Sequence, residues 1–122
     1  MIDLRKLLVT YLKILHPRVY FQVAPENAVF PYITYDIPSI ICDGEGFEVA
    51  TIDIDGWDLN NTGDTTIIEN LMATINALDK KNLSNENISI FFFLDNKLAI
   101  IDEDKRIKRR EYTYQCRIIR RE

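Results

Sequence analysis

Four aspartates stand close together in the stretch DIDGWDLNNTGD, residues 53–64: Asp53, Asp55, Asp58 and Asp64. Carboxylates at this density can hold a divalent cation, and a pair of them can position Mg²⁺ for phosphodiester chemistry. A calcium loop of the EF-hand kind needs oxygen ligands at positions 1, 3 and 5, glycine at position 6 and a carboxylate at position 12. Counted from Asp53, glycine falls at position 4 and tryptophan at position 5, so the calcium register fails.

Asp53 and Asp55 are the pair best placed for Mg²⁺, because residues two apart on a strand share a face. No basic residue lies near them in the sequence, and no histidine completes a ligand set. We therefore interpret the stretch as a solvated strand face, a turn and a helix start. Phosphate-binding loops and the common hydrolase motifs are also missing from the sequence. We expect no catalytic, cofactor-binding or metal-binding residues and no enzyme; a metal-dependent nuclease is the least favoured function.

The composition is that of one folded domain, which we expect to span residues 1–122. The apolar fraction is 47% and the charged fraction 28%, both ordinary for a folded protein. The first residues form an amphipathic pattern and not a signal peptide, and no apolar run has the length of a membrane span. Synthesis inside the cell is expected, with Cys42 and Cys116 as reduced thiols that are too far apart in sequence for a zinc knuckle.

Charge is distributed unevenly along the chain. Residues 1–104 hold 7 Lys and Arg against 17 Asp and Glu, whereas residues 105–122 hold 8 against 2. The basic cluster consists of Lys105, Arg106, Lys108, Arg109 and Arg110. Such a split is typical of nucleic-acid binding or of two surfaces that attract each other in an oligomer. A solvated loop and strand start explains the cluster equally well.

The first half of the chain predicts a helix followed by strands. Helical spacing of apolar residues begins after Asp3 and ends near His16, where Pro17 disfavours the helix. Alternation and β-branched residues predict strands over Val19–Val23 and Tyr32–Ile37, joined by a loop. Pro38 should end the second strand, cause a bulge or mark an edge, and the CDGEG stretch after it should form a turn.

The second half predicts a strand over EVATIDIDGWDL, residues 48–59, with Gly56 as a possible bulge. A helix should follow over Thr66–Lys80, opened by a capping box of Thr66 and Glu69. After a polar loop, NLSNEN, two apolar runs flank Asp95–Asn96, which predicts a tight hairpin, and KRREYTYQCRIIR reads as the last strand. The order α-β-β-β-α-β-β-β favours an α+β fold, a mostly antiparallel sheet with two helices packed on it.

The expected core lies where the helices meet the sheet. Its named members are Leu8, Tyr11, Ile52, Ile54, Leu71 and Ile75. Tyr112, Tyr114, Cys116 and Ile118 should share one face of the last strand and pack inward. Three consecutive phenylalanines, Phe91 to Phe93, indicate a strand buried on both sides, with a neighbouring subunit as one possible cover.

Two stretches carry a resemblance to a known family. They are HPRVYFQVAPENAVFPYITYDIP, residues 16–38, and LDNKLAIIDEDKRIKRREYTYQCRIIR, residues 94–120. Together with the spacing of both helices and the VATIDIDGWD strand, they resemble the tail terminator, or tail-completion, proteins of long-tailed bacteriophages and prophages. The resemblance covers nearly the whole chain. The DIDGWD segment departs from the family pattern by adding Asp53 and Asp55.

The resemblance implies a structural protein of the virion, made in the cytoplasm of a bacterial host. Tail terminators form a ring, usually hexameric, that caps the tail tube and joins it to the head connector, while DNA passes through without specific binding. The partners would be further copies of the chain, the tail-tube protein and the connector, with no membrane. Interface candidates are Lys105, Arg106, Lys108, Arg109, Arg110, Asp53 and Asp55. Two alternatives stay open: another connector or minor tail component, and a small regulatory or nucleic-acid-binding domain that uses the basic strand.

Overall fold

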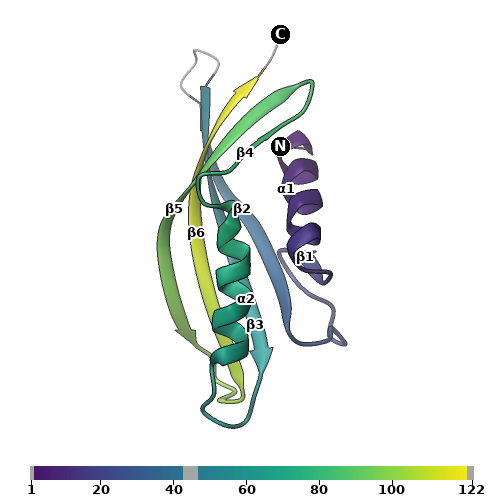
Figure 1. Ribbon diagram of the computed structural model, residues 1–122, viewed down its shortest axis with the longest axis vertical. Coiled ribbons are helices and arrows are strands. Elements are labelled where there is room, and N and C mark those ends of the chain that lie inside the picture. Colours follow the sequence, from purple (N-terminus) through teal and green to yellow (C-terminus); the bar gives the residue numbers. More distant parts are fainter. Residues whose placement is uncertain (1, 43–46, 121–122) are drawn as a thin grey trace.

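The computed structural model describes residues 2–42 and 47–120. Two α-helices and a six-stranded sheet make up the fold (Figure 1). The elements are α1 (Ile2–Leu15), β1 (Val19–Phe21), β2 (Tyr32–Cys42), β3 (Phe47–Leu59), α2 (Thr66–Ile75), β4 (Asn82–Ser84), β5 (Ile88–Ile101) and β6 (Ile107–Arg120), with a short 3-10 helix η1 (Asn76–Leu78) after α2. The strand order across the sheet is β1-β2-β3-β6-β5-β4.

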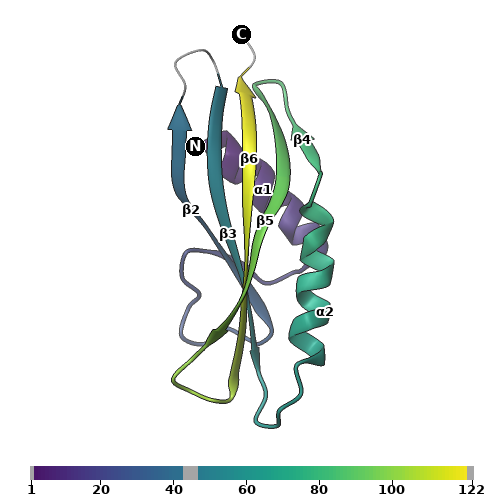
Figure 2. The same cartoon turned by 90° about the vertical axis from the view of Figure 1, so that its left-hand side faces the viewer.

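Both helices cover the same face of the sheet, and no helix of the described residues lies on the other face (Figure 2). All neighbouring strands are antiparallel except β1 and β2, which are parallel. The α+β class, the mostly antiparallel sheet and the order α-β-β-β-α-β-β-β are therefore confirmed.

The last three strands differ from the expected ones. The tight hairpin at Asp95–Asn96 is wrong, because β5 runs on through these residues with only a shift of register between Leu94 and Asn96. The chain reverses later, between Ile101 and Ile107. The structure also has a strand that was not predicted, β4. Its three residues lie within the stretch NLSNEN, which was interpreted as a polar loop.

Local backbone geometry explains the changed boundaries in the first half. β1 ends at Phe21, and Gln22 has a φ of 66°, a left-handed conformation that a strand does not contain. β2 passes Pro38 through a register shift between Asp36 and Ser39, which is the bulge that was one of three expectations for this proline. The predicted CDGEG turn falls largely on residues 43–46, outside the described residues.

The capping box at the start of α2 is wrong. Thr65 is the N-cap and makes no side-chain capping bond. The Asp64 carboxylate instead accepts hydrogen bonds from the backbone N–H and the hydroxyl of Thr66, at 2.9 and 2.6 Å. The carboxylate of Glu69 pairs with Arg110. The helix ends at Ile75, earlier than the predicted Lys80.

One core joins the helices to the covered face of the sheet. Its members include Leu4, Leu8 and Leu12 of α1, Ile68, Met72 and Ile75 of α2, and Ala50, Ile52, Ile54, Phe92, Tyr114, Cys116 and Ile118 of the sheet. Five of the six named core residues are buried, and Tyr11 is partly buried at the margin. The shared face of Tyr112, Tyr114, Cys116 and Ile118 is confirmed, with Tyr112 also at the margin.

Gly56 does not mark a bulge, because the pairing of β3 with β6 continues through it. It lies directly beneath α2. A Cβ atom at this position would stand 2.5 Å from Met72 Sδ and 3.0 Å from Ile68 Cδ1. The glycine therefore lets the helix pack directly on the strand.

The helix-two stripe gives a matched pair of stability tests. Ile75 is fully buried, whereas Ile67 on the same helix is half exposed. Ile75→Ala should lower the free energy of unfolding by roughly 2–5 kcal/mol, the cost of lost burial plus a cavity. Ile67→Ala should change it by less than about 0.5 kcal/mol. Urea denaturation measures both, and equal effects would mean that the helix does not pack as described.

Candidate functional site

The helix-free face of the sheet, here called the open face, is organised in rows across the strands. The register places Asp36, Asp53, Thr113 and Asn96 in one row, and Thr34, Asp55, Glu111 and Leu98 in the next. Trp57 and Arg109 stand opposite each other in the following row. The expected outward direction of Asp53 and Asp55 is therefore confirmed. Alternation along each strand keeps these side chains together and away from the core.

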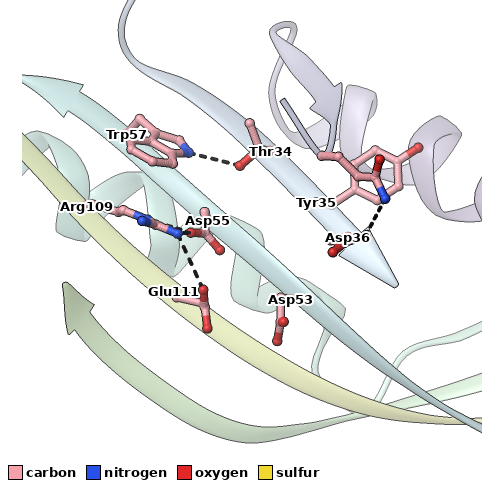
Figure 3. Close-up of a pocket in the computed structure, with 9 residues that line it drawn as sticks. Thr34, Tyr35, Asp36, Asp53, Asp55, Trp57, Arg109 and Glu111 are labelled. Carbon is pink, nitrogen blue, oxygen red and sulfur yellow. Dashed lines mark hydrogen bonds and ion pairs between the residues drawn. The ribbon is translucent and has the colours of Figure 1, made fainter. Parts of the chain in front are cut away.

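A pocket of about 160 Å³ opens among these rows (Figure 3). It is lined by Gln22, Thr34, Tyr35, Asp36, Asp53, Asp55, Trp57, Arg109 and Glu111. Four carboxyl groups and one guanidinium group thus line the same pocket. The sequence interpretation of a solvated acidic face is wrong for Asp55, which is 5% exposed. Asp58, which is 4% exposed, lies on the helix side.

Arg109 holds the pocket together. Its Nε donates a hydrogen bond of 2.6 Å to Asp55 Oδ2, and its guanidinium group lies 3.7 Å from Glu111 Oε2. The same group stacks over the Trp57 ring, 4.3 Å from the ring centre. Trp57 in turn donates a hydrogen bond of 2.9 Å from Nε1 to Thr34 Oγ1. Three strands are therefore cross-linked by one arginine and one tryptophan.

The carboxyl groups of the pocket disfavour one another's ionised forms. Burial and the neighbouring Asp55 carboxylate raise the pKa of Glu111 to about 7. Burial also raises the pKa of Asp55, although the hydrogen bond and charge of Arg109 oppose that rise. Asp55 has the arginine in direct contact, so we assign the more tightly held proton to Glu111.

Asp53 stands beside this group and is not bound to Arg109. Its carboxylate accepts a hydrogen bond of 2.9 Å from the Thr113 hydroxyl. Within residues 2–42 and 47–120, no three or more His, Cys, Asp or Glu side chains form a group that could hold a metal ion. The pocket as described joins carboxylates to an arginine and to hydroxyl groups.

The basic cluster is largely neutralised by acids of the same chain. Arg106 pairs with Asp104 at 2.8 Å, and Arg110 pairs with Glu69 at 2.8 Å. Arg109 pairs with Asp55, so the solvated-loop interpretation fails for this residue. Lys105 and Lys108 make no ion pair with the described acids. The role of the basic cluster in a subunit or tail interface stays a prediction.

Apolar side chains occupy the open face beyond the acidic rows. Phe47, Val49, Phe93 and Ile119 are all exposed there, with Phe91 partly so. Phe92 is fully buried on the helix side. The interpretation of this strand as buried on both sides is therefore wrong for a single chain, because no element of the described chain covers the outer phenylalanines.

Sequence reasoning missed Glu111, Trp57, Thr34 and Asp36 as neighbours of Asp55. The alternation of the last strand already places Arg109 and Glu111 on one face. That alternation alone could not show that they lie beside Asp55 and Trp57, because this depends on the register between β6 and β3.

Comparison with solved structures finds chains of similar fold. A chain from the virion of a native gene transfer agent (GTA) particle matches with a TM-score of 0.65 and 19% sequence identity, over 88% of this chain and 84% of that one. At this identity the likeness is one of fold. No family model and no curated protein matches. None of the helices in the described residues has the length and apolar character to cross a membrane.

Neutralising two arginines of the basic cluster should lower the free energy of unfolding by very different amounts. Arg109→Gln leaves the buried Asp55 carboxylate without its partner and should lower the free energy of unfolding by roughly 3–5 kcal/mol. Arg106→Gln removes an exposed pair and should cost at most about 1 kcal/mol. Denaturant unfolding of both variants checks this. Asp55→Asn should recover part of the Arg109→Gln loss, and an equal cost for the two arginines would contradict the burial of the pair.

The raised pKa of Glu111 predicts a pH-dependent stability. A carboxyl group that holds its proton more tightly when folded stabilises the fold at low pH and loses that contribution as pH rises through its folded pKa, about 7. Glu111→Gln should therefore be more stable than the wild type at pH 8 by about 1–2 kcal/mol, after allowance for solvent screening, and the difference should shrink toward pH 5.

His16 acts in the opposite direction, because burial lowers its pKa. Its contribution is common to both proteins and cancels in the difference. Unfolding at pH 5, 6, 7 and 8 measures that difference, and the exposed Glu86→Gln serves as the control. A difference that does not vary with pH would contradict the assignment.

Proposed function

We propose that this chain is a structural protein of a phage-type virion, a tail terminator that forms a ring, caps the tail tube and meets the head connector. One observation carries the proposal: a virion chain has the same fold over most of the length of both chains. The match covers 88% of this chain and 84% of the other, so it concerns the whole fold and not a common substructure.

Two further observations support the proposal. The stretches at residues 16–38 and 94–120 resemble the tail terminator family, and they supply β1, the first part of β2, the second half of β5 and β6. The open face also carries exposed phenylalanine, valine and isoleucine side chains beside an acidic pocket. Exposed apolar patches of this kind are typical of proteins that associate with others.

The role proposed is mechanical and not catalytic. Subunits contact one another and the tail, and DNA passes the ring without tight binding, since strong phosphate contacts would hold it. The pairing of Arg106, Arg109 and Arg110 with acids of the same chain supports this over the nucleic-acid-binding alternative. Lys105 and Lys108, at the β5–β6 end of the sheet, are assigned to the tail or connector contact.

Deleting the gene from a host that makes the particles tests the function directly. Electron microscopy should show heads without tails and tails that are unjoined or of irregular length, and the wild-type gene supplied on a plasmid should restore whole particles. Purified wild-type particles should also contain the chain. Normal, joined particles after deletion would contradict the proposal. A monomer that shifts DNA tightly in gels at low salt would favour the nucleic-acid-binding domain instead.

A further inference from the structure

The exposed side of α1 is a basic surface that the fold leaves uncovered. Its exposed residues are Ile2, Lys6, Thr10, Lys13 and Ile14. No ion pair joins Lys6 or Lys13 to an acid within residues 2–42 and 47–120. Lys81 lies next to this helix, with its ammonium group 5.3 Å from the centre of the Tyr11 ring. Three lysines and two exposed isoleucines therefore form one surface, here called the α1 surface.

The open face has a charge opposite to that of the α1 surface, and it too combines charged with apolar side chains. Its pocket brings Asp36, Asp53, Asp55 and Glu111 together with a single arginine. Asp36 and Asp53 accept hydrogen bonds from Gln22 and Thr113 but form no ion pair with a described residue. Phe93 and Ile119, 39% and 49% exposed, extend the face beyond the acids. The acids sit at partly buried positions, where a cation of a partner would be screened less than in open solvent.

We propose that the open face of one copy of this chain binds the α1 surface of a second copy. The inference rests on the proposed ring and names the two surfaces that meet in it. The lysines of α1 lie against the acidic pocket, and the isoleucines of α1 lie against the apolar side chains of the open face. Because the two surfaces are on different parts of the molecule, the contact is heterologous, which is the type of contact that a ring of identical subunits requires.

The dimensions of the two surfaces agree. α1 has 14 residues and is therefore about 21 Å long at 1.5 Å per residue. From Phe47 to Asp55 along β3 the open face extends roughly 27 Å. Lys6 and Lys13 are separated by about 10 Å along the helix axis, which lets both reach acids of one face.

The basic cluster of the C-terminal segment fits this role less well. Asp102, Glu103 and Asp104 directly precede it and offset its charge locally, and three of its arginines are paired within the chain. The α1 surface has only Asp3 as a nearby acid of its own helix. Charge complementarity therefore selects α1 as the partner of the open face.

Two charge-reversal variants separate the surfaces. Lys6→Glu with Lys13→Glu changes only exposed helix positions, and Asp53→Lys places a cation among carboxylates, so both should stay folded by circular dichroism. Each alone should raise the dissociation constant of self-association at least about tenfold, because like charges then oppose each other. Lys97→Glu, at an exposed position of β5 that belongs to neither surface, is the control and should associate as the wild type does.

Mixing the two variants is the decisive experiment. The intact helix surface of Asp53→Lys can bind the intact open face of the Lys6→Glu, Lys13→Glu protein, and the two altered surfaces carry swapped charges that can also meet. Sedimentation at high protein concentration should therefore show monomers for each variant alone and restored association, with both variants in the complex, for the mixture. A chain that carries all three substitutions should recover association through the swapped charges.

Other outcomes overturn the inference. Monomers in the mixture would mean that the open face pairs with itself or with another partner. A wild type that remains monomeric at about millimolar concentration would exclude this contact between copies. Neither result touches the deletion phenotype, so failure of the contact and failure of the proposed function are distinguishable.

Discussion

Strand β3 pairs with β6 without interruption from Phe47–Ile119 to Leu59–Ile107, and this ladder fixes the positions of all the other elements. On one side of the ladder, alternate residues from both strands form the floor on which α1 and α2 pack. On the other side, the same register sets Trp57 beside Arg109 and Asp55 beside Glu111. The core and the pocket thus lie on opposite faces of the same pair of strands. A register shift of one residue in either strand would move its core side chains to the open face and its pocket side chains to the core.

The chain neutralises most of its own charge asymmetry. An acidic body and a basic C-terminal segment look separate in the sequence, but β6 crosses the middle of the sheet and brings its arginines to acids of β3 and α2. What remains for contact with other molecules is the charge that this pairing does not use. That charge lies in the acidic pocket of the open face and in the lysines on and beside α1.

Periodicity was enough to predict the two helices, the presence of strands β2, β3 and β6, and most residues of the core. Leu8, Ile52, Ile54 and Ile75 follow from spacing alone, because a residue's face depends on its near neighbours in the chain. The failures concern information that is not local. Asp95–Asn96 has the residues of a turn, yet the ladder with β6 carries β5 straight through it.

The pocket also could not be predicted from local sequence patterns. Asp55 and Arg109 are 54 residues apart, and only the strand register brings them together. Glu69 fitted a capping box by sequence, but the position of Arg110 across the sheet gave it a different partner. Gly56 had the appearance of a bulge, and the reason for its small size is the close packing of Met72. In each case a distant element supplied the deciding contact.

Trp57 is the only tryptophan of the chain and lines the pocket of the open face. Its fluorescence therefore reports directly whether that face becomes covered when copies of the chain associate. Iodide quenching and the emission maximum should be followed across a protein concentration series, alongside the sedimentation mass. A fall in quenching and a blue shift that track the rise in mass would show that the open face is the contact surface. A rise in mass with unchanged quenching and emission would contradict it.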